Sequence, residues 1–311
     1  MKMESLWDAN AAYYDRFASA HSMYRRSSRI LVNHAGIQPG MVVVDLGCGT
    51  GVSTSAILKK LKDKGRVIGV DISSNMLAIA RARIKSKRAR FYHAPAEELD
   101  SVITKPVDRI VCNCSFWQFQ NKEKVIAAVS KLLKPDGLLL FNSYIDMDGL
   151  EVAPYSNSVI DLILEQKKSV LGGKSRSASG KRYPLAMGNG PSARRAAQKS
   201  PYKSEIIDIR RYGLKVTPLK EYEIELSTRE RLAFYRIPCM GSFLSDLTQE
   251  QREMVLEAAE KNLKTKKSVA LRAGLWGPHG CLPQTVKPSK RIINTVSLPC
   301  TVLAIAHSDS G

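Results

Sequence analysis

VVVDLGCGTGVSTSAIL, residues 42–58, places three glycines within five positions, between an apolar run and a helix-like segment. The run is short, rich in β-branched residues and apolar up to Asp45, as is typical of a strand buried in a parallel sheet. Gly47, Gly49 and Gly51 then turn the chain, and their missing side chains allow the backbone to approach a ligand closely. This stretch therefore predicts a strand, a ligand-binding loop and a helix in succession.

The strand and helix patterns continue to alternate after this loop. We expect strands at 66–71, 89–93, 109–112 and 138–142, and helices at 53–62, 75–84 and 122–133. Such alternation predicts an α/β fold built on a doubly wound, mostly parallel, seven-stranded Rossmann-like sheet. N-terminal cap helices and a lid insertion in the C-terminal half complete the expected architecture.

The chain is expected to divide into four parts. Residues 1–38 form cap helices, residues 39–145 the ligand-binding core, and residues 207–311 the remaining strands with a helical lid. Residues 146–206 are predicted to be a mobile basic insertion, because residues 166–204 contain ten Lys or Arg and no Asp or Glu. Two interpretations stay open, a solvated loop or a patch that attracts nucleic acid, anionic lipid or an anionic substrate.

Composition narrows the class of protein. The 311 residues carry a formal net charge of +19, and no run approaches the roughly eighteen apolar residues of a membrane span. Acidic residues near the N-terminus do not fit a signal peptide, so we expect a soluble, cytoplasmic protein. The six cysteines are scattered without CxxC or Cys/His pairs, which indicates reduced thiols and no metal site. Cys112 and Cys114 are interpreted as small buried residues in preference to metal or arsenic ligands.

The spacing of the glycines discriminates between ligands. The loop reads G-C-G-T-G, which is neither the G-x-G-x-x-G of dinucleotide folds nor the lysine-containing loop that holds a triphosphate. Asp71 ends the next predicted strand, RVIGVD, where a carboxylate can accept both hydroxyls of a ribose. The pattern favours a nucleoside and disfavours a pyrophosphate.

Several motifs in order resemble the class I S-adenosylmethionine-dependent methyltransferases. VVDLGCGTG resembles the first motif of that family, VIGVDIS the second, HAPAEEL the adenine-contacting turn, RIVCNCSFWQF the fourth-strand motif and KLLKPDGLLLF the approach to the fifth strand. DANAAYYDRFA resembles the cap helix of its small-molecule branch, which includes the quinone-ring C-methyltransferases. The resemblance covers about 100 residues and fades after Asn142, apart from a general likeness around Tyr212.

The resemblance implies S-adenosylmethionine as the cofactor and assigns roles by matching position. The loop would lie against the methionine portion with Asp45 beneath it, and Asp71 would hold the ribose. Further residues would contact the adenine or close over the carboxylate end. The implied cofactor-binding residues are Tyr14, Asp45, Gly47, Cys48, Gly49, Gly51, Asp71, Ile72, Met76, Ala96, Glu97 and Asn113.

One position departs from the family pattern. Pro95 stands where the family commonly has an acidic residue that accepts from the adenine amino group. Glu97 or a water would then replace it, or specificity there would be looser. Taken singly, Met76 and Tyr14 also fit ordinary packing, and Asp45 also fits a residue that only orients the loop.

Methyl transfer from a sulfonium needs positioning and exclusion of water more than a covalent intermediate. The sequence identifies no catalytic base; His21, His279 and Tyr14 are weak candidates. An acceptor pocket with aromatic walls is expected after the fourth strand and under the cap. Its candidate residues are Tyr13, Phe17, Phe116, Trp117, Tyr144 and Met240.

The leading hypothesis is in-line methyl transfer to a small organic acceptor, such as an aromatic, quinone-like or natural-product molecule. An RNA or protein methyltransferase that uses the basic insertion is the alternative, although NCSFW replaces the Asn-Pro-Pro-Tyr type of motif after the fourth strand. A third hypothesis is a non-enzymatic S-adenosylmethionine-binding protein. The sequence leaves the oligomeric state and the methylated atom open.

Overall fold

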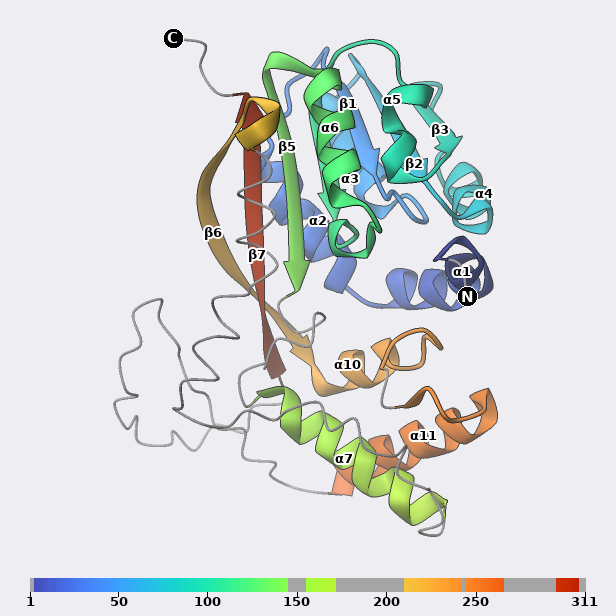
Figure 1. Ribbon diagram of the computed structural model, residues 1–311. Helices are drawn as coiled ribbons and strands as arrows, with labels where there is room; N and C mark the ends of the chain where they lie inside the picture. Colours follow the sequence, from blue (N-terminus) through green and yellow to red (C-terminus); the bar gives the residue numbers. More distant parts are fainter. Residues whose placement is uncertain (1–2, 145–154, 172–209, 242–243, 266–294, 308–311) are drawn as a thin grey trace, which may run out of the picture. The chain divides into compact units, whose positions relative to one another are not determined.

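A computed structural model describes residues 3–144, 155–171, 210–241, 244–265 and 295–307 (Figure 1). The chain forms two compact units. The first contains Met1–Tyr144, Ala186–Ile224 and Pro299–Gly311, and the second contains Ile145–Leu185 and Glu225–Leu298. The predicted four-part division remains a prediction, and most of residues 146–206 lie outside the described residues.

The first unit is built on a mixed, mostly parallel sheet. Its strands are β1 (Val42–Leu46), β2 (Arg66–Asp71), β3 (Ala89–His93), β4 (Val107–Asn113), β5 (Leu133–Tyr144), β6 (Leu214–Ser227) and β7 (Thr295–His307). They lie in the order β3-β2-β1-β4-β5-β7-β6. The pairs from β3 to β5 are parallel, and β7 runs antiparallel to β5. The predicted doubly wound α/β fold is confirmed, with its strand order reversing between β1 and β4.

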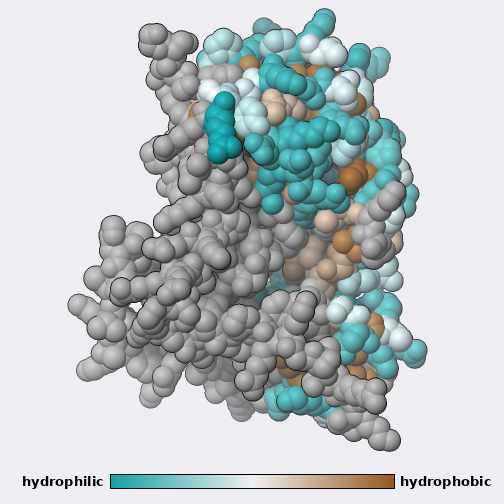
Figure 2. Space-filling view, viewed as in Figure 1, coloured by the Kyte–Doolittle hydropathy of each residue, from teal (hydrophilic) through white to brown (hydrophobic). Residues whose placement is uncertain are grey.

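Two apolar layers cover the two faces of this sheet, because successive strand residues point to opposite sides. On one face Val43 and Val111 pack with α2 (Met23–His34) and α3 (Val52–Leu61). On the other, Val44 and Ile110 pack with α5 (Leu99–Val102) and α6 (Lys122–Leu132). Figure 2 shows hydrophilic residues over much of the described surface of the first unit on the side viewed.

Two further helices flank the sheet. Helix α1 (Met3–Ala20) contacts α4 (Ser74–Arg83), and α4 contacts β2 and β3. The predicted N-terminal helical segment is therefore two helices, α1 and α2. Ser73 caps α4 by accepting a hydrogen bond from the amide of Met76, as short hydroxyl side chains commonly do at helix starts.

The second unit has an apolar core of its own. Helices α7 (Tyr155–Val170), α10 (Thr228–Phe234) and α11 (Gln249–Thr265) supply buried side chains that include Ile163, Leu232 and Leu256. The buried guanidinium of Arg252 donates to the carbonyls of Tyr235, Met240 and Leu244, at 2.7–3.1 Å, and so holds the segment between α10 and α11. Within the described ranges, no helix is long and apolar enough to cross a bilayer.

Candidate cofactor site

The glycine-rich loop joins β1 to α3 at the point where the strand order reverses. Gly47, Gly49 and Gly51 have φ angles of +69°, +50° and +86°, which glycine adopts without the penalty that a side chain brings. The loop amides are already engaged: those of Gly47 and Cys48 donate to the Val70 carbonyl at 2.8 and 3.1 Å, and that of Gly51 donates to the Cys48 carbonyl at 2.9 Å. The loop is therefore organised by neighbouring backbone.

Packing around the loop also requires the absence of side chains. A Cβ on Gly47 would lie 2.3 Å from Oγ of Ser115, a residue that follows β4. A Cβ on Gly69, in β2, would lie 2.9 Å from Sγ of Cys48. Both approaches are closer than carbon contacts permit, so strands β1, β2 and β4 meet tightly beneath the loop.

Two carboxylates, the buried Asp45 and the half-buried Asp71, lie at the ends of β1 and β2. Asp71 accepts from the amides of Gly49 (Oδ2, 2.8 Å) and Ser73 (Oδ1, 2.9 Å), and burial raises its pKa. Asp45 has no exposed surface, and burial raises its pKa to about 7. Its Oδ2 accepts from the Thr54 hydroxyl at 2.5 Å, and its Oδ1 has no partner among the described residues. Negative charge and an unsatisfied acceptor favour a ligand with cationic or hydroxyl groups.

Helix α1 lies at the carboxyl ends of the strands (Figure 1). The Trp7 indole donates to Oε1 of Gln118, which follows β4, at 2.5 Å. Asp8 accepts from the Ser73 hydroxyl at 2.6 Å and from the Asn75 amide at 3.0 Å, so it ties α1 to the start of α4. Together these contacts span the sheet edge on both sides of the glycine loop.

Tyr14, on the same helix, lies beside the loop. A Cβ on Gly49 would lie 3.8 Å from Cε1 and 3.9 Å from the hydroxyl oxygen of Tyr14. The ring packs on Tyr24, with centroids 4.8 Å apart. Burial raises the pKa of the Tyr14 hydroxyl well above its usual value, with smaller contributions from Cys114, Asp71 and Asp45. At neutral pH this group is thus a hydrogen-bond donor and not a base.

A buried polar chain supports the end of β4. Cys114 has a φ of +59°, an uncommon conformation for a residue with a side chain, and its amide donates to Oδ1 of Asn142 at 2.7 Å. The Asn142 amide nitrogen donates to Oδ1 of Asn113 at 3.0 Å, and Asn113 in turn donates to Ser28 Oγ at 3.0 Å. Asn142 was not among the residues expected from the sequence, because nothing in its own segment signals a contact with β4.

The residues expected around an adenine lie after β2 and β3. Ile72 is half-buried, Met76 is buried on α4, and Ala96 begins a short 3-10 helix (Ala96–Glu98) that follows Pro95. Oε1 of Glu97 accepts from the Asn121 amide at 3.0 Å, so one of its oxygens is committed to the start of α6. These residues therefore lie at the carboxyl edge of the sheet, where Asp71 also lies.

Two of the aromatic residues expected at the acceptor are buried. Phe116 is 2% exposed and stacks on Phe141, with ring centroids 4.2 Å apart, so its place at the acceptor stays a prediction. Phe17 is also buried, between His21 (4.8 Å) and Tyr24 (5.9 Å). Both aromatic rings are enclosed by packing that their sequence positions do not reveal.

The remaining candidates are dispersed. Tyr13 is half-buried with the Arg16 guanidinium 5.6 Å from its ring centroid, and Met240 is buried in the second unit. Tyr144 ends β5, and Trp117 lies in the turn after β4, but neither side chain is described. His279 lies outside the described residues.

Four cysteines have side chains that the structure describes. Cys48, Cys112 and Cys114 are buried free thiols, and Cys239 is half-buried. Among the described residues no group of His, Cys, Asp and Glu is arranged to hold a metal ion. Lys167, within the predicted basic insertion at residues 146–206, lies in α7 and pairs with Asp246 at 2.6 Å. Residues 146–154 and 172–206 of that insertion lie outside the described residues.

Part of the chain is similar to known methyltransferases. A family model described as a methyltransferase domain matches residues 37–174. The malonyl-[acyl-carrier protein] O-methyltransferase of Priestia megaterium is 29% identical over 147 residues, which cover 46% of this chain and 51% of that protein. The ubiquinone/menaquinone biosynthesis C-methyltransferase UbiE of Hydrogenovibrio crunogenus is 29% identical over 145 residues, 45% of this chain and 57% of that protein. The chain thus spans about half the length of these curated relatives.

A solved structure shares the fold at greater length. A putative methyltransferase from an antibiotic biosynthesis pathway of Anabaena variabilis superposes with a TM-score of 0.51 at 14% identity, covering 89% of this chain and 96% of that one. At this identity the match concerns the fold alone.

Proposed function

We propose that the chain carries a class I S-adenosylmethionine-dependent methyltransferase domain and that it transfers the methyl group of this cofactor to a small organic acceptor. The observation that carries the proposal is the Asp71–Gly49 hydrogen bond at the switch point of the sheet. It places the half-buried Asp71 carboxylate beside a loop that lacks side chains, where a nucleoside could bind the carboxylate and its cationic tail could lie along the loop.

The residues present fit S-adenosylmethionine. Gly47, Gly49 and Gly51 form a cradle that a Cβ would fill or strain, and Asp45 has a buried oxygen without a described partner. We assign the methionine portion to this loop, with Cys48, and the ribose hydroxyls to Asp71. The cationic amine and sulfonium of the ligand would offset the repulsion that Asp71 exerts on the buried Asp45 carboxylate.

The remaining assignments concern the adenine, the methionine side and the carboxylate end of the ligand. Ile72, Met76 and Ala96 are proposed to contact the adenine, and Asn113 the methionine side through its main chain. Tyr14 is proposed to close over the carboxylate end, since its ring already lies beside Gly49. Its raised pKa keeps the hydroxyl protonated for hydrogen bonding to that carboxylate.

Bound S-adenosylmethionine supplies a methyl group that is already activated on sulfur. The protein has then to align an acceptor with the S–CH₃ bond and to keep water out. Helix α1, held at both sides of the loop by Trp7 and Asp8, is proposed to exclude water from the cofactor. The names of the two relatives, an O-methyltransferase and a quinone-pathway C-methyltransferase, support a small organic acceptor in preference to a nucleic acid.

The test is transfer of radiolabelled methyl from S-adenosylmethionine into a cell extract separated into small molecules, RNA and protein. We expect label in the small-molecule fraction. Label confined to RNA or to protein would contradict the proposed acceptor class while supporting methyl transfer. Failure of S-adenosylmethionine to raise the melting temperature of the purified protein would contradict the proposed cofactor itself.

A further inference from the structure

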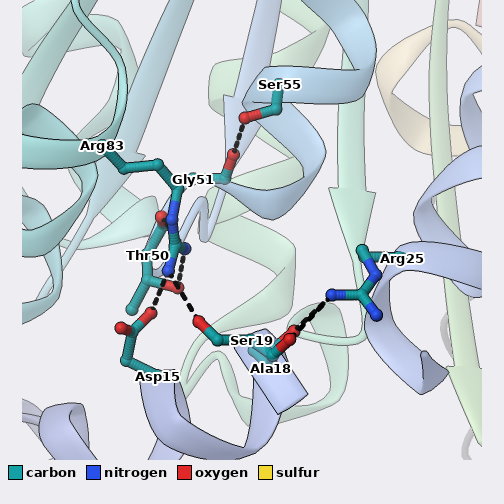
Figure 3. A network of polar contacts seen from close by, with 8 residues as sticks. All are labelled: Asp15, Ala18, Ser19, Arg25, Thr50, Gly51, Ser55 and Arg83. Carbon is teal, nitrogen blue, oxygen red and sulfur yellow. Dashed lines mark hydrogen bonds and ion pairs between the residues drawn. The ribbon is translucent and has the colours of Figure 1, made fainter. Parts of the chain in front are cut away.

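Arg83, the last residue of α4, makes four contacts with two other elements (Figure 3). Its Nη1 donates to the Thr50 carbonyl at 2.7 Å and to the Thr50 hydroxyl at 2.8 Å. Its Nη2 donates to the carboxylate of Asp15 and, at 3.1 Å, to the hydroxyl of Ser19. One side of the guanidinium thus binds the glycine loop and the other binds α1.

The contact with the Thr50 carbonyl acts on the peptide unit that joins Thr50 to Gly51. Thr50 has no exposed surface, so its carbonyl needs a partner inside the protein. Arg83 supplies that partner at the oxygen, while the Gly51 amide of the same peptide unit donates to Cys48. Because Gly49 and Gly51, on either side of Thr50, have positive φ and little intrinsic restraint, these two bonds orient the Thr50–Gly51 peptide unit.

The Asp15 and Ser19 contacts act on the last two turns of α1. Figure 3 shows both side chains pointing at the Arg83 guanidinium, with Arg25 of α2 beside them. Arg25 donates to the Ala18 and Ser19 carbonyls at 3.4 and 2.9 Å, so it closes the end of α1 without touching the loop. Arg83 is the group in this network that joins α1 to the loop.

We propose that Arg83 is a positioning residue that couples the docking of α1 to the conformation of the glycine loop, so that the cofactor is retained while α1 is docked. The inference rests on the proposed function, because the retained ligand is S-adenosylmethionine or its product. Arginine suits this role because its planar fork can serve two elements at fixed geometry, which the single ammonium of lysine does not. Tyr14, between these contacts and those of Trp7, would move with the helix.

The test measures the dissociation rate, koff, of S-adenosylhomocysteine from the full-length chain by stopped flow. Arg83→Gln should raise koff about tenfold, equivalent to about 1.4 kcal/mol. Asp15→Ala, which leaves the Thr50 contacts in place and favours helix, should raise koff about threefold. The koff of the double variant should not exceed that of Arg83→Gln alone, because both changes break the same link between Arg83 and Asp15.

Arg81→Gln is the matched control. Arg81 is an exposed arginine on the same helix that donates to the Phe91 carbonyl at 2.9 Å and contacts neither α1 nor the loop in the described bonds. We expect its koff to stay within about twofold of the wild-type value, a change smaller than about 0.5 kcal/mol.

Hydrogen exchange separates coupling from general destabilisation. In the wild type, S-adenosylhomocysteine should slow exchange in residues 3–20 as well as in the loop; in Arg83→Gln it should slow only the loop. Wild-type koff in Asp15→Ala, or ligand-induced protection of α1 that survives in Arg83→Gln, would overturn the coupling. Absence of binding to the wild type would overturn the proposed function and this inference with it, so the two failures are distinguishable.

Discussion

Asp71 accepts a hydrogen bond from the backbone amide of Gly49 at 2.8 Å, so the carboxylate at the end of β2 holds the middle of the loop that follows β1. A second bond, from the Ser73 amide at 2.9 Å, holds the same carboxylate at the start of α4. Asp71 therefore organises the cradle in addition to its proposed contact with the ribose.

Replacement of Asp71 should remove both functions. We expect Asp71→Ala to weaken S-adenosylmethionine binding at least about 100-fold, because two charge-assisted hydrogen bonds of about 1.5–3 kcal/mol each are lost. Calorimetric titration gives the affinity, and the ligand-induced rise in melting temperature should largely disappear. Asp100→Ala, which breaks an exposed ion pair with Lys131 on α6, should bind normally. Equal affinity in the two variants would contradict the assignment of Asp71.

Gly47 is expected to be intolerant of any side chain. Gly47→Ala adds a Cβ 2.3 Å from Ser115 Oγ, whereas Gly40→Ala adds one with nothing within 4 Å, and both positions have positive φ. The clash should cost about 1–3 kcal/mol of unfolding free energy beyond the backbone strain that both variants share. Urea denaturation measures this difference, and only Gly47→Ala should also weaken cofactor binding. Similar stability of both variants would mean that β4 and its loop can move away from β1.

Asp45 should make stability depend on pH. Burial raises its pKa from 3.8 to about 7, so between those values the folded protein binds a proton that the unfolded chain releases. The free energy of unfolding should therefore fall as pH rises through this window, by at most about 1.4 kcal/mol per pH unit. Below pH 4 both states are protonated and the effect vanishes.

Asp45→Asn isolates this contribution, since it keeps an acceptor for the Thr54 hydroxyl and leaves Asp71 to titrate in both proteins. Urea denaturation at pH 5, 6, 7 and 8 should show the stability of the variant rising relative to the wild type. A difference that is constant over this range would show that Asp45 is ionised throughout.

Asp8 should stabilise the docking of α1. Its hydrogen bonds to Ser73 and Asn75 lower the pKa of the carboxyl, the Ser73 bond most strongly. Its contribution is therefore present above pH 3.8 and is lost as pH falls through the lower folded value. At pH 7 we expect Asp8→Ala to cost about 1 kcal/mol, the usual loss of a residue that caps helix amides.

Thermal unfolding at pH 7 checks this expectation. Asp63→Ala, an exposed residue in the turn between α3 and β2, is the control and should melt like the wild type. An equal melting temperature for Asp8→Ala and Asp63→Ala would show that the contacts of α1 with α4 add nothing to stability.

Local sequence patterns determined the sheet and the position of the loop. The strands at 66–71 and 89–93 coincide with β2 and β3, because both segments are short and rich in β-branched or aromatic residues, which favour strands. The three loop glycines all adopt positive φ, which is a property of the residue type as well as of the fold. Asp71 ends its strand as expected, so its place at the carboxyl edge follows from the register of a parallel sheet.

Tertiary structure alone decided which distant side chains complete the site. Arg83 meets Thr50, Asp15 and Ser19, and Asp8 meets Ser73, across separations of 33 to 68 residues that leave no periodic trace in the sequence. Phe116 turns inward onto Phe141 because the space between β5 and the turn after β4 must be filled, and a short aromatic turn does not reveal that. Hydrophobic pattern specifies which face of an element is buried, whereas partner choice between elements depends on how those faces are brought together in space.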